Sequence, residues 1–213
     1  MRWKGFKDVQ ATIEIDLKNK KEEDLWNSLD KDARWGVNKA EKSGLKIELT
    51  ENENTWKEFY KIYKKTCQYG NIIPFEFKDI KKSKLFACFL KNKLIAGAVV
   101  RIKDKKIILF LNASSHEFLK YQPNNLLYWS IIKWGNKENF KIFDLGGYQL
   151  NAKKSNKLYH INRFKSRWGG EIKKYHIYSK NPFYILGRKI IRNFYFIKKI
   201  RDDFKVWRNK KKL

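Results

Sequence analysis

Two hydrophobic periodicities divide this chain into strands and helices. Apolar and polar residues alternate in short stretches, as in a half-buried strand, whereas longer stretches repeat apolar residues every three to four positions, as in an amphipathic helix. Alternation at 9–17 and 45–49, and short apolar segments bounded by turns elsewhere, predict strands at residues 9–17, 45–49, 85–90, 94–102, 106–112, 141–145 and 171–178. The helical spacing predicts helices at residues 22–42, 54–68 and 123–137, and a helical turn at 158–167.

The order of these elements predicts the fold class. Short turns at 91–93 and 103–105 join three consecutive strands into a β-meander, after which the chain forms a helix and a further strand. This order is typical of an α/β fold with a mixed, mostly antiparallel sheet and helices on both faces.

The C-terminal residues differ from the rest. Asn181-Pro182 marks a boundary, so we expect one domain at 1–180 and a basic amphipathic helix at 181–213. Apolar side chains in that helix are interspersed with eleven Lys or Arg and two Asp, a net charge of +9. Such a helix is typical of contact with a membrane surface, here through residues 183–212. Packing on its own domain and contact with nucleic acid are the alternatives.

Composition narrows the class of protein. With 42% hydrophobic and 16% aromatic residues, the 213-residue chain can build a packed core, which excludes a disordered basic tail. Its net charge of +27 favours a polyanionic partner, either nucleic acid or an anionic membrane surface, although a Lys-rich codon bias gives the same excess. Cys67 and Cys88 are too few for a disulfide scaffold or a four-ligand zinc site, and we expect them reduced in the core. The spacing of His116, His160 and His176 indicates no metal site.

No signal for export or membrane insertion is visible in the sequence. The residues after Met1 lack an apolar run before a small-residue cleavage site. The longest apolar stretch, Leu94 to Val100, is far short of the ~20 residues that a membrane span needs. We therefore expect a cytoplasmic protein, free or peripheral on the inner face of the membrane.

Three segments carry a family resemblance through their order and spacing. They are residues 24–44, residues 121–147 ending in Asp144-Leu145-Gly146-Gly147, and residues 161–171 around Phe164-Lys165. Together they resemble the Fem-type peptidoglycan bridge-forming aminoacyltransferases and the related GNAT-like acetyltransferase domains, including the BioF2-like ones. The resemblance covers about residues 12–178 and concerns only the second of the two GNAT-like halves of Fem proteins.

The resemblance implies a GNAT-like fold and transfer of an amino acid from aminoacyl-tRNA to an amine of a peptidoglycan-type cell-wall precursor, free or lipid-linked. Because Fem proteins hold their substrate cleft near the junction of the halves, we expect a separate first-half partner or a homo-oligomer to complete it. In the helix at 22–42, Arg34 and Lys39 match basic positions of the family, whereas Trp35 and Asn38 depart from them.

The loop before the helix at 123–137 bears on the acyl donor. Acetyl-CoA-dependent GNAT enzymes bind pyrophosphate here with a glycine-rich loop, through backbone N–H groups at the helix start. In this chain the loop is Tyr121-Gln122-Pro123-Asn124-Asn125, which has no glycine, and Pro123 has no N–H. We therefore expect aminoacyl-tRNA as the donor and no bound cofactor, with acyl-CoA as the alternative donor.

Acyl transfer to an amine needs a deprotonated amine and a cation or hydrogen-bond donor for the developing oxyanion. Lys165 is the first catalytic candidate, because the resemblance places the Phe164-Lys165 pair at the donor end of the cleft. There it would either bind a tRNA phosphate or stabilise the oxyanion, and the alternative is that it is one more surface lysine among many. Asp144 is the second candidate: it would orient the amine or act as a base, or else hydrogen-bond the glycine turn and hold the fold. His160 is a further candidate base.

Candidates for substrate binding surround these residues. Arg34 would clamp a phosphate or carboxylate, or form a surface ion pair with Asp30. Arg163 and Arg167 extend a basic patch around Lys165, and Trp168 is available for stacking, as on an RNA-contacting surface. The full set of candidates is Arg34, Lys39, Tyr121, Asn124, Asn125, Tyr148, Arg163, Phe164 and Arg167.

The sequence as a whole predicts an acyltransferase of the Fem-like aminoacyl-transferring kind. Two alternatives stay open: an acyl-CoA-dependent N-acyltransferase acting on a small substrate, and a truncated, non-catalytic GNAT-like module that binds nucleic acid or a membrane. The Phe-Lys and Asp-x-Gly-Gly segments favour an enzyme, whereas the match to a single half favours the module.

Overall fold

The computed structural model describes residues 6–155 and 157–193, and for residues 188–193 it describes the backbone alone. The strands are β1 (Phe6–Asp16), β2 (Leu45–Thr50), β3 (Lys84–Leu90), β4 (Lys93–Lys103), β5 (Lys106–Ser114), β6 (Ile142–Tyr148) and β7 (Glu171–Ser179). The helices are α1 (Glu22–Asn27), α2 (Lys31–Lys42), α3 (Glu53–Tyr69), α4 (Phe77–Ile80), the 3-10 helix η1 (His116–Tyr121), α5 (Pro123–Lys137), α6 (Lys157–Ser166) and α7 (Pro182–Asn193).

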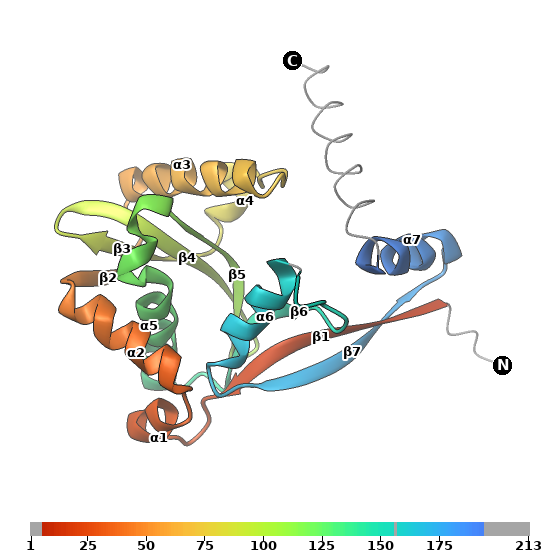
Figure 1. Cartoon of the computed structure of the whole chain (residues 1–213), viewed down its shortest axis with the longest axis horizontal. Helices are drawn as coiled ribbons and strands as arrows, with labels where there is room; N and C mark the ends of the chain where they lie inside the picture. Colours follow the sequence, from red (N-terminus) through yellow and green to blue (C-terminus); the bar gives the residue numbers. More distant parts are fainter. Residues whose placement is uncertain (1–5, 156, 194–213) are drawn as a thin grey trace, which may run out of the picture.

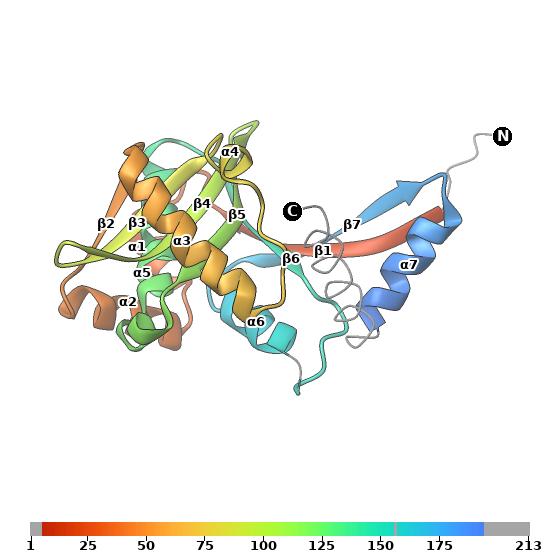
Figure 2. The same cartoon turned by 90° about the horizontal axis from the view of Figure 1, so that it is seen from above.

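All these strands form one sheet with the order β2-β3-β4-β5-β6-β1-β7. Neighbouring strands are antiparallel except β5 and β6, which run parallel. Helices α2 and α5 cover one face of the sheet and α3 covers the other (Figures 1 and 2). The expected α/β fold, with a mixed and mostly antiparallel sheet between helices, is confirmed.

An apolar core lies on each face of the sheet. The larger core contains Val37 of α2, Leu127 of α5 and Trp168, all fully buried. The smaller core packs Phe59 of α3 against Leu85 of β3. Because both faces are covered, the central strands are apolar on both sides rather than cleanly alternating.

The helix expected at 22–42 is two helices, α1 and α2, with a break at 28–30. The carboxylate of Asp30 accepts a hydrogen bond from the Asp32 N–H at 2.7 Å and caps α2. The Asp30 N–H donates to the carbonyl oxygen of Arg167 at 2.9 Å, which ties the break to the end of α6. The expectation of one helix is wrong because the apolar spacing continues across a break that local capping produces.

The other expected elements are present with small shifts in their bounds. The short helices α4 and η1 are additional, and β6 continues past its expected end at 145 to include Gly146 and Gly147. Cys67 and Cys88 are buried free thiols, as expected.

A two-stranded arm leaves the body of the protein. β1 pairs with β7 from Phe6 to Glu14, but with β6 only from Ala11 onward, so the outer ends of β1 and β7 pair with each other alone. Helix α7 starts at Pro182, with the Asn181 carboxamide accepting from the Phe183 N–H at 2.9 Å, and lies beside the two strand ends as a further part of the arm (Figures 1 and 2). The expected helix at 181–213 is thus seen as far as Asn193, and its remainder lies outside the described residues.

The two parallel strands diverge soon after they meet, and this creates the site. Pairing between β5 and β6 covers only three rungs, the last of them Ile108 with Asp144. Gly146 follows with a φ of +74°, a conformation that glycine adopts without the steric cost other residues meet. β5 and β6 therefore separate at this point, and a gap opens between their C-terminal halves.

Candidate active site

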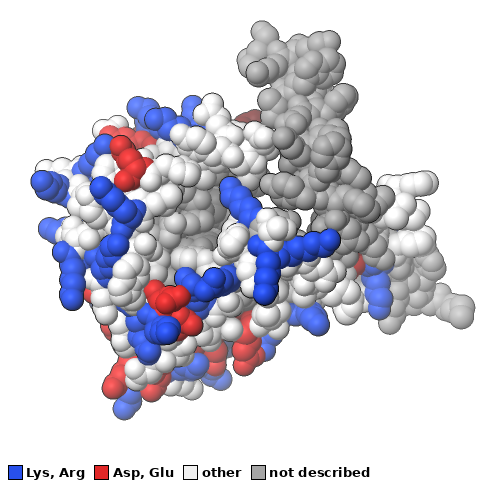
Figure 3. All heavy atoms as spheres, in the orientation of Figure 1, with Lys and Arg blue, Asp and Glu red and all other residues white. Residues whose placement is uncertain are grey.

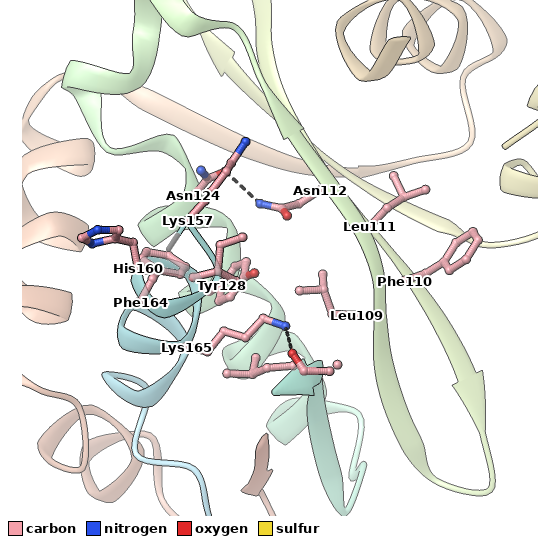
Figure 4. A pocket seen from close by; sticks show the side chains of 14 residues that line it. Leu109, Phe110, Leu111, Asn112, Asn124, Tyr128, Lys157, His160, Phe164 and Lys165 are labelled. Atoms are coloured by element: carbon pink, nitrogen blue, oxygen red, sulfur yellow. Dashed lines mark hydrogen bonds between the residues drawn. The ribbon is translucent and has the colours of Figure 1, made fainter. Parts of the chain in front are cut away.

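A pocket of about 520 Å3 occupies the gap between β5 and β6. Helix α5 supplies Asn124 and Tyr128, and α6 closes the pocket with a row of side chains that includes Phe164 and Lys165 (Figure 4). Figure 3 shows a hollow in this face of the molecule with Lys and Arg side chains around it. The complete lining is Leu109, Phe110, Leu111, Asn112, Asn124, Tyr128, Leu145, Gly146, Gly147, Lys157, His160, Ile161, Phe164 and Lys165.

Lys165 is a cation in the pocket lining, and its surroundings in the pocket lower its pKa. Its Nζ donates a hydrogen bond to the carbonyl oxygen of Gly147 on β6 at 2.9 Å. Burial lowers the pKa of Lys165 from its ordinary value of 10.5 to about 8, while the negative charge of Asp144 acts in the opposite direction. The amine is therefore mostly protonated at neutral pH but close to the range in which it loses its charge.

Asp144 lies beneath the pocket and is held from three sides. Its carboxylate accepts hydrogen bonds from the Thr12 hydroxyl and from the Gly146 N–H, the latter at 2.8 Å. Its other oxygen pairs with Lys106 Nζ at 2.8 Å, and Lys106 also contacts Glu14 at 2.5 Å. These partners come from β1, β5 and β6. Asp144 therefore joins the three strands at the last residue pair before β5 and β6 diverge.

Lys106 is the cation shared by the two carboxylates of this cluster. Burial lowers the pKa of Lys106, but its hydrogen bonds to Asp144 and Glu14 outweigh burial and raise the pKa above its ordinary value. Asp144 is buried, and it is absent from the pocket lining. Of the two roles considered for it, the geometry favours the one in which it holds the glycine turn.

The two neighbouring asparagines of α5 lie in different surroundings. Asn124 lines the pocket, where its Oδ1 accepts from Ser114 Oγ at 2.7 Å and from Asn112 Nδ2 at 3.3 Å (Figure 4). Asn125 is buried and donates to the carbonyl oxygen of Ala33 on α2 at 3.4 Å. The structure thus brings Asn124 to the site and places Asn125 in the contact between two helices.

Aromatic side chains support α6 against α5. The ring of Phe164 packs edge-on against Tyr128 at a centroid distance of 5.2 Å, and Trp168 packs against both rings. Burial raises the pKa of Tyr128, so its phenol is neutral in the physiological range. These contacts fix the part of α6 that carries Lys165. Trp168 itself is fully buried, so it is not the exposed stacking platform that the sequence suggested.

The basic residues predicted on or near α2 have partners outside the pocket. Arg34 donates to the carbonyl oxygen of Asn27 at 3.4 Å rather than pairing with Asp30, whose carboxylate caps α2. Lys39 lies over the Trp35 ring at 4.8 Å. Arg167 pairs with Asp32 at 2.7 Å and so joins the end of α6 to α2.

The remaining predicted residues lie at the margins. Tyr121 stacks with Phe118 at the end of η1 and does not line the pocket. Tyr148 lines a smaller pocket of about 170 Å3, which shares Gly147 and Ile161 with the main pocket. Arg163 is exposed on α6, whereas His160, the alternative base, lines the main pocket.

Part of the lining was not predicted from the sequence, above all the β5 residues from Leu109 to Asn112, together with Tyr128 and Lys157. The alternation of β5 indicates only which side chains are buried. The pocket uses β5 because β6 separates from it, and the sequence signal for that is the glycine pair Gly146-Gly147.

Comparison with known families and structures agrees with this architecture. The model of the FemAB family matches residues 2–73, and that of the acetyltransferase (GNAT) domain matches residues 81–155. Among solved structures, FemX superposes with a TM-score of 0.69 at 17% identity, over 83% of this chain and 63% of that one. The C-terminal domain of a putative lysylphosphatidylglycerol synthetase from Agrobacterium fabrum gives a TM-score of 0.66 at 13% identity, over 86% and 64% of the chains.

The curated relatives share a shorter stretch. Lipid II:glycine glycyltransferases from Staphylococcus haemolyticus and Staphylococcus aureus are 27% identical over 75 residues, which is 35% of this chain and 18% of theirs. The structure and these matches together show a GNAT-like fold with similarity to the Fem type, so the resemblance seen in the sequence is confirmed. The expectation of an acyltransferase agrees with the same matches.

Proposed function

We propose that this protein is a Fem-like acyltransferase, which moves an amino acid from aminoacyl-tRNA onto an amine of a peptidoglycan-type cell-wall precursor. The observation that carries the proposal is Lys165: a desolvated, hydrogen-bonded cation in a pocket between two diverging strands. The similarity to lipid II glycyltransferases supports the choice of acceptor.

The reaction needs the protein mainly to position the amine and the ester and to supply a positive charge for the developing oxyanion. The neutral acceptor amine attacks the ester carbonyl carbon, a C–N bond forms, and negative charge develops on the carbonyl oxygen. The C–O bond to the ribose then breaks, and the proton lost by the amine ends on the departing ribose oxygen. The Lys165 ammonium donates a hydrogen bond to the oxyanion, and the partly apolar pocket strengthens that interaction by excluding water.

The start of α5 favours tRNA over CoA as the donor. Gln122 has a left-handed conformation with φ +60°, Pro123 is the first helical residue and has no N–H, and the Asn124 side chain is tied to β5. A pyrophosphate would therefore meet few free backbone donors at this helix end. Lys157 and Arg163, both exposed on α6, instead offer cations near the pocket for a phosphodiester backbone.

Further expectations belong to the same proposal. The enzyme works in the cytoplasm at the inner face of the membrane and uses no resident cofactor. A second copy of the chain completes its cleft, so that the purified chain acts by itself, and a separate first-half partner is the alternative. The tRNA donor is the component that distinguishes this proposal from the other functions considered.

The test offers the purified chain each donor in turn. We expect a labelled amino acid to pass from a pool of charged tRNAs to a lipid-linked muropeptide, and no acetyl transfer when acetyl-CoA replaces the tRNA. Transfer from acetyl-CoA alone would overturn the tRNA assignment. Failure with both donors, in a folded sample, would contradict activity of this chain by itself and favour a non-catalytic module or one that lacks its partner.

Acyl-CoA-dependent N-acylation of a small substrate is the second candidate. The specific observation in its favour is the match of residues 81–155, which include β5 and most of the pocket's strand walls, to the acetyltransferase (GNAT) domain. The acetyl-CoA reaction above tests it directly.

A further inference from the structure

The arm of the molecule exposes apolar side chains outside both cores. We define the arm as residues 6–10 and 175–179 together with α7. Ile185 of α7 is buried, with only 3% of its surface exposed, whereas Phe183 is 78% and Leu186 is 52% exposed. Tyr178 on β7 is 54% exposed. Since positions three apart share a face of a helix, Phe183 and Leu186 form one apolar patch on α7.

The sequence around this patch is strongly basic. Between Glu171 and Asp202 the chain has no acidic residue and nine Lys or Arg. Lys174 and Lys180, which directly precede and follow residues 175–179 of the arm, are exposed. A partner that contacts this part of the protein must therefore tolerate or prefer a high positive charge.

We propose that the arm binds the surface of an anionic lipid bilayer, with Phe183 and Leu186 inserted among the lipids and the basic residues around them at the headgroups. Among the described residues, none of the helices could span a bilayer. The proposal rests on the proposed function in one respect, since a bilayer carries the lipid-linked acceptor.

Two other occupants fit the arm less well. RNA would stack its bases on the aromatic side chains of the arm and would bind the basic side chains through its phosphates. It offers no partner to the aliphatic side chain of Leu186. A second copy of the chain would bring two surfaces of the same positive charge together, which opposes association. An anionic bilayer satisfies the aliphatic, aromatic and basic side chains together.

The test measures binding of the full chain to vesicles that contain no muropeptide, so its outcome is independent of transfer activity. Vesicles of phosphatidylcholine alone are compared with vesicles of phosphatidylcholine and phosphatidylglycerol, by sedimentation. We expect binding to the anionic vesicles only, and at least about tenfold weaker binding for the F183S/L186S variant, because two apolar side chains no longer leave water.

A matched variant keeps the comparison specific. Trp35 and Ile72 are 56% and 55% exposed and lie away from the arm, so W35S/I72S removes a similar apolar area and should bind as the wild type does. Equal binding of F183S/L186S and the wild type would overturn the proposal. A variant F183S/L186S that loses tRNA binding but keeps vesicle binding would also overturn it and would identify RNA as the partner. So would a wild type that binds no vesicles and forms a dimer which F183S/L186S converts to a monomer.

Discussion

Lys165 on α6 donates to the carbonyl oxygen of Gly147 on β6 at 2.9 Å, across the mouth of the gap that β6 leaves beside β5. This contact joins the two features that define the site. The glycine turn opens the pocket, and the lysine brings a cation into it. Because burial lowers the pKa of that lysine to about 8, its charge can be changed within an experimentally convenient pH range, and the pH dependence of transfer can test its role.

The pH dependence of transfer should report Lys165. If its ammonium stabilises the oxyanion, its contribution is complete only well below pH 8 and is lost as the pH rises through the pKa of about 8. Arginine stays charged throughout, so the ratio of K165R to wild-type turnover should rise above that pH. Turnover is measured between pH 6 and 10 with the acceptor saturating. A ratio that falls with pH would instead identify Lys165 as a base.

Gly146 and Gly147 form a natural pair for testing the turn. Gly146 has φ +74°, and an added Cβ would lie 3.3 Å from the carbonyl oxygen of Leu109 and 3.8 Å from Lys165 Nζ. Gly146→Ala should therefore cost about 1–2 kcal/mol of stability and lower turnover. For Gly147, an added Cβ meets nothing within 4 Å, so Gly147→Ala should have a smaller effect on both. Urea denaturation measures the stability of both variants, and the transfer rate measures their turnover. Equal effects of the two substitutions would contradict the role given to Gly146 in the turn.

Asn124 and Asn125 should separate function from stability. Asn124→Ala removes a polar group from the pocket wall and should lower transfer with little change in melting temperature. Asn125→Ala removes the buried hydrogen bond to Ala33 and leaves a void between α2 and α5, so it should lower the melting temperature. Thermal melts and initial rates of both variants provide the check. A kinetic defect confined to Asn125→Ala would reverse the assignment.

The cluster of Asp144, Lys106 and Glu14 should stabilise the fold. Lys106→Met leaves two carboxylates without their cation and should destabilise by about 1–3 kcal/mol, as should Asp144→Asn, with the double variant less destabilised than the two effects combined. Lys173→Met is the control, because its pair with Glu171 is exposed to solvent, where water and salt screen it, so its loss should change stability little. Additive effects of Lys106→Met and Asp144→Asn would show that the pair is not coupled.

The fold was largely readable from the sequence, because apolar strand segments bounded by turns, period-two alternation and helical spacing all follow burial. The break between α1 and α2 was not, since a capping carboxylate, Asp30, interrupts an unbroken apolar spacing. At the site, Lys165, Phe164 and Asn124 came from sequence segments that carry the resemblance. The β5 wall and the Lys106–Asp144 pair depend on how three strands meet, which the local pattern of one strand does not encode.

The most direct test of the central claim measures transfer of a labelled amino acid from charged tRNA to lipid-linked muropeptide by three proteins: the wild type, K165A, and K42A as an exposed-lysine control on α2. We predict transfer by the wild type and K42A, and a loss of about 100-fold or more in K165A at an unchanged melting temperature. Equal turnover by K165A and the wild type, or an equal loss in K42A, would contradict the assignment of the active site to the pocket around Lys165.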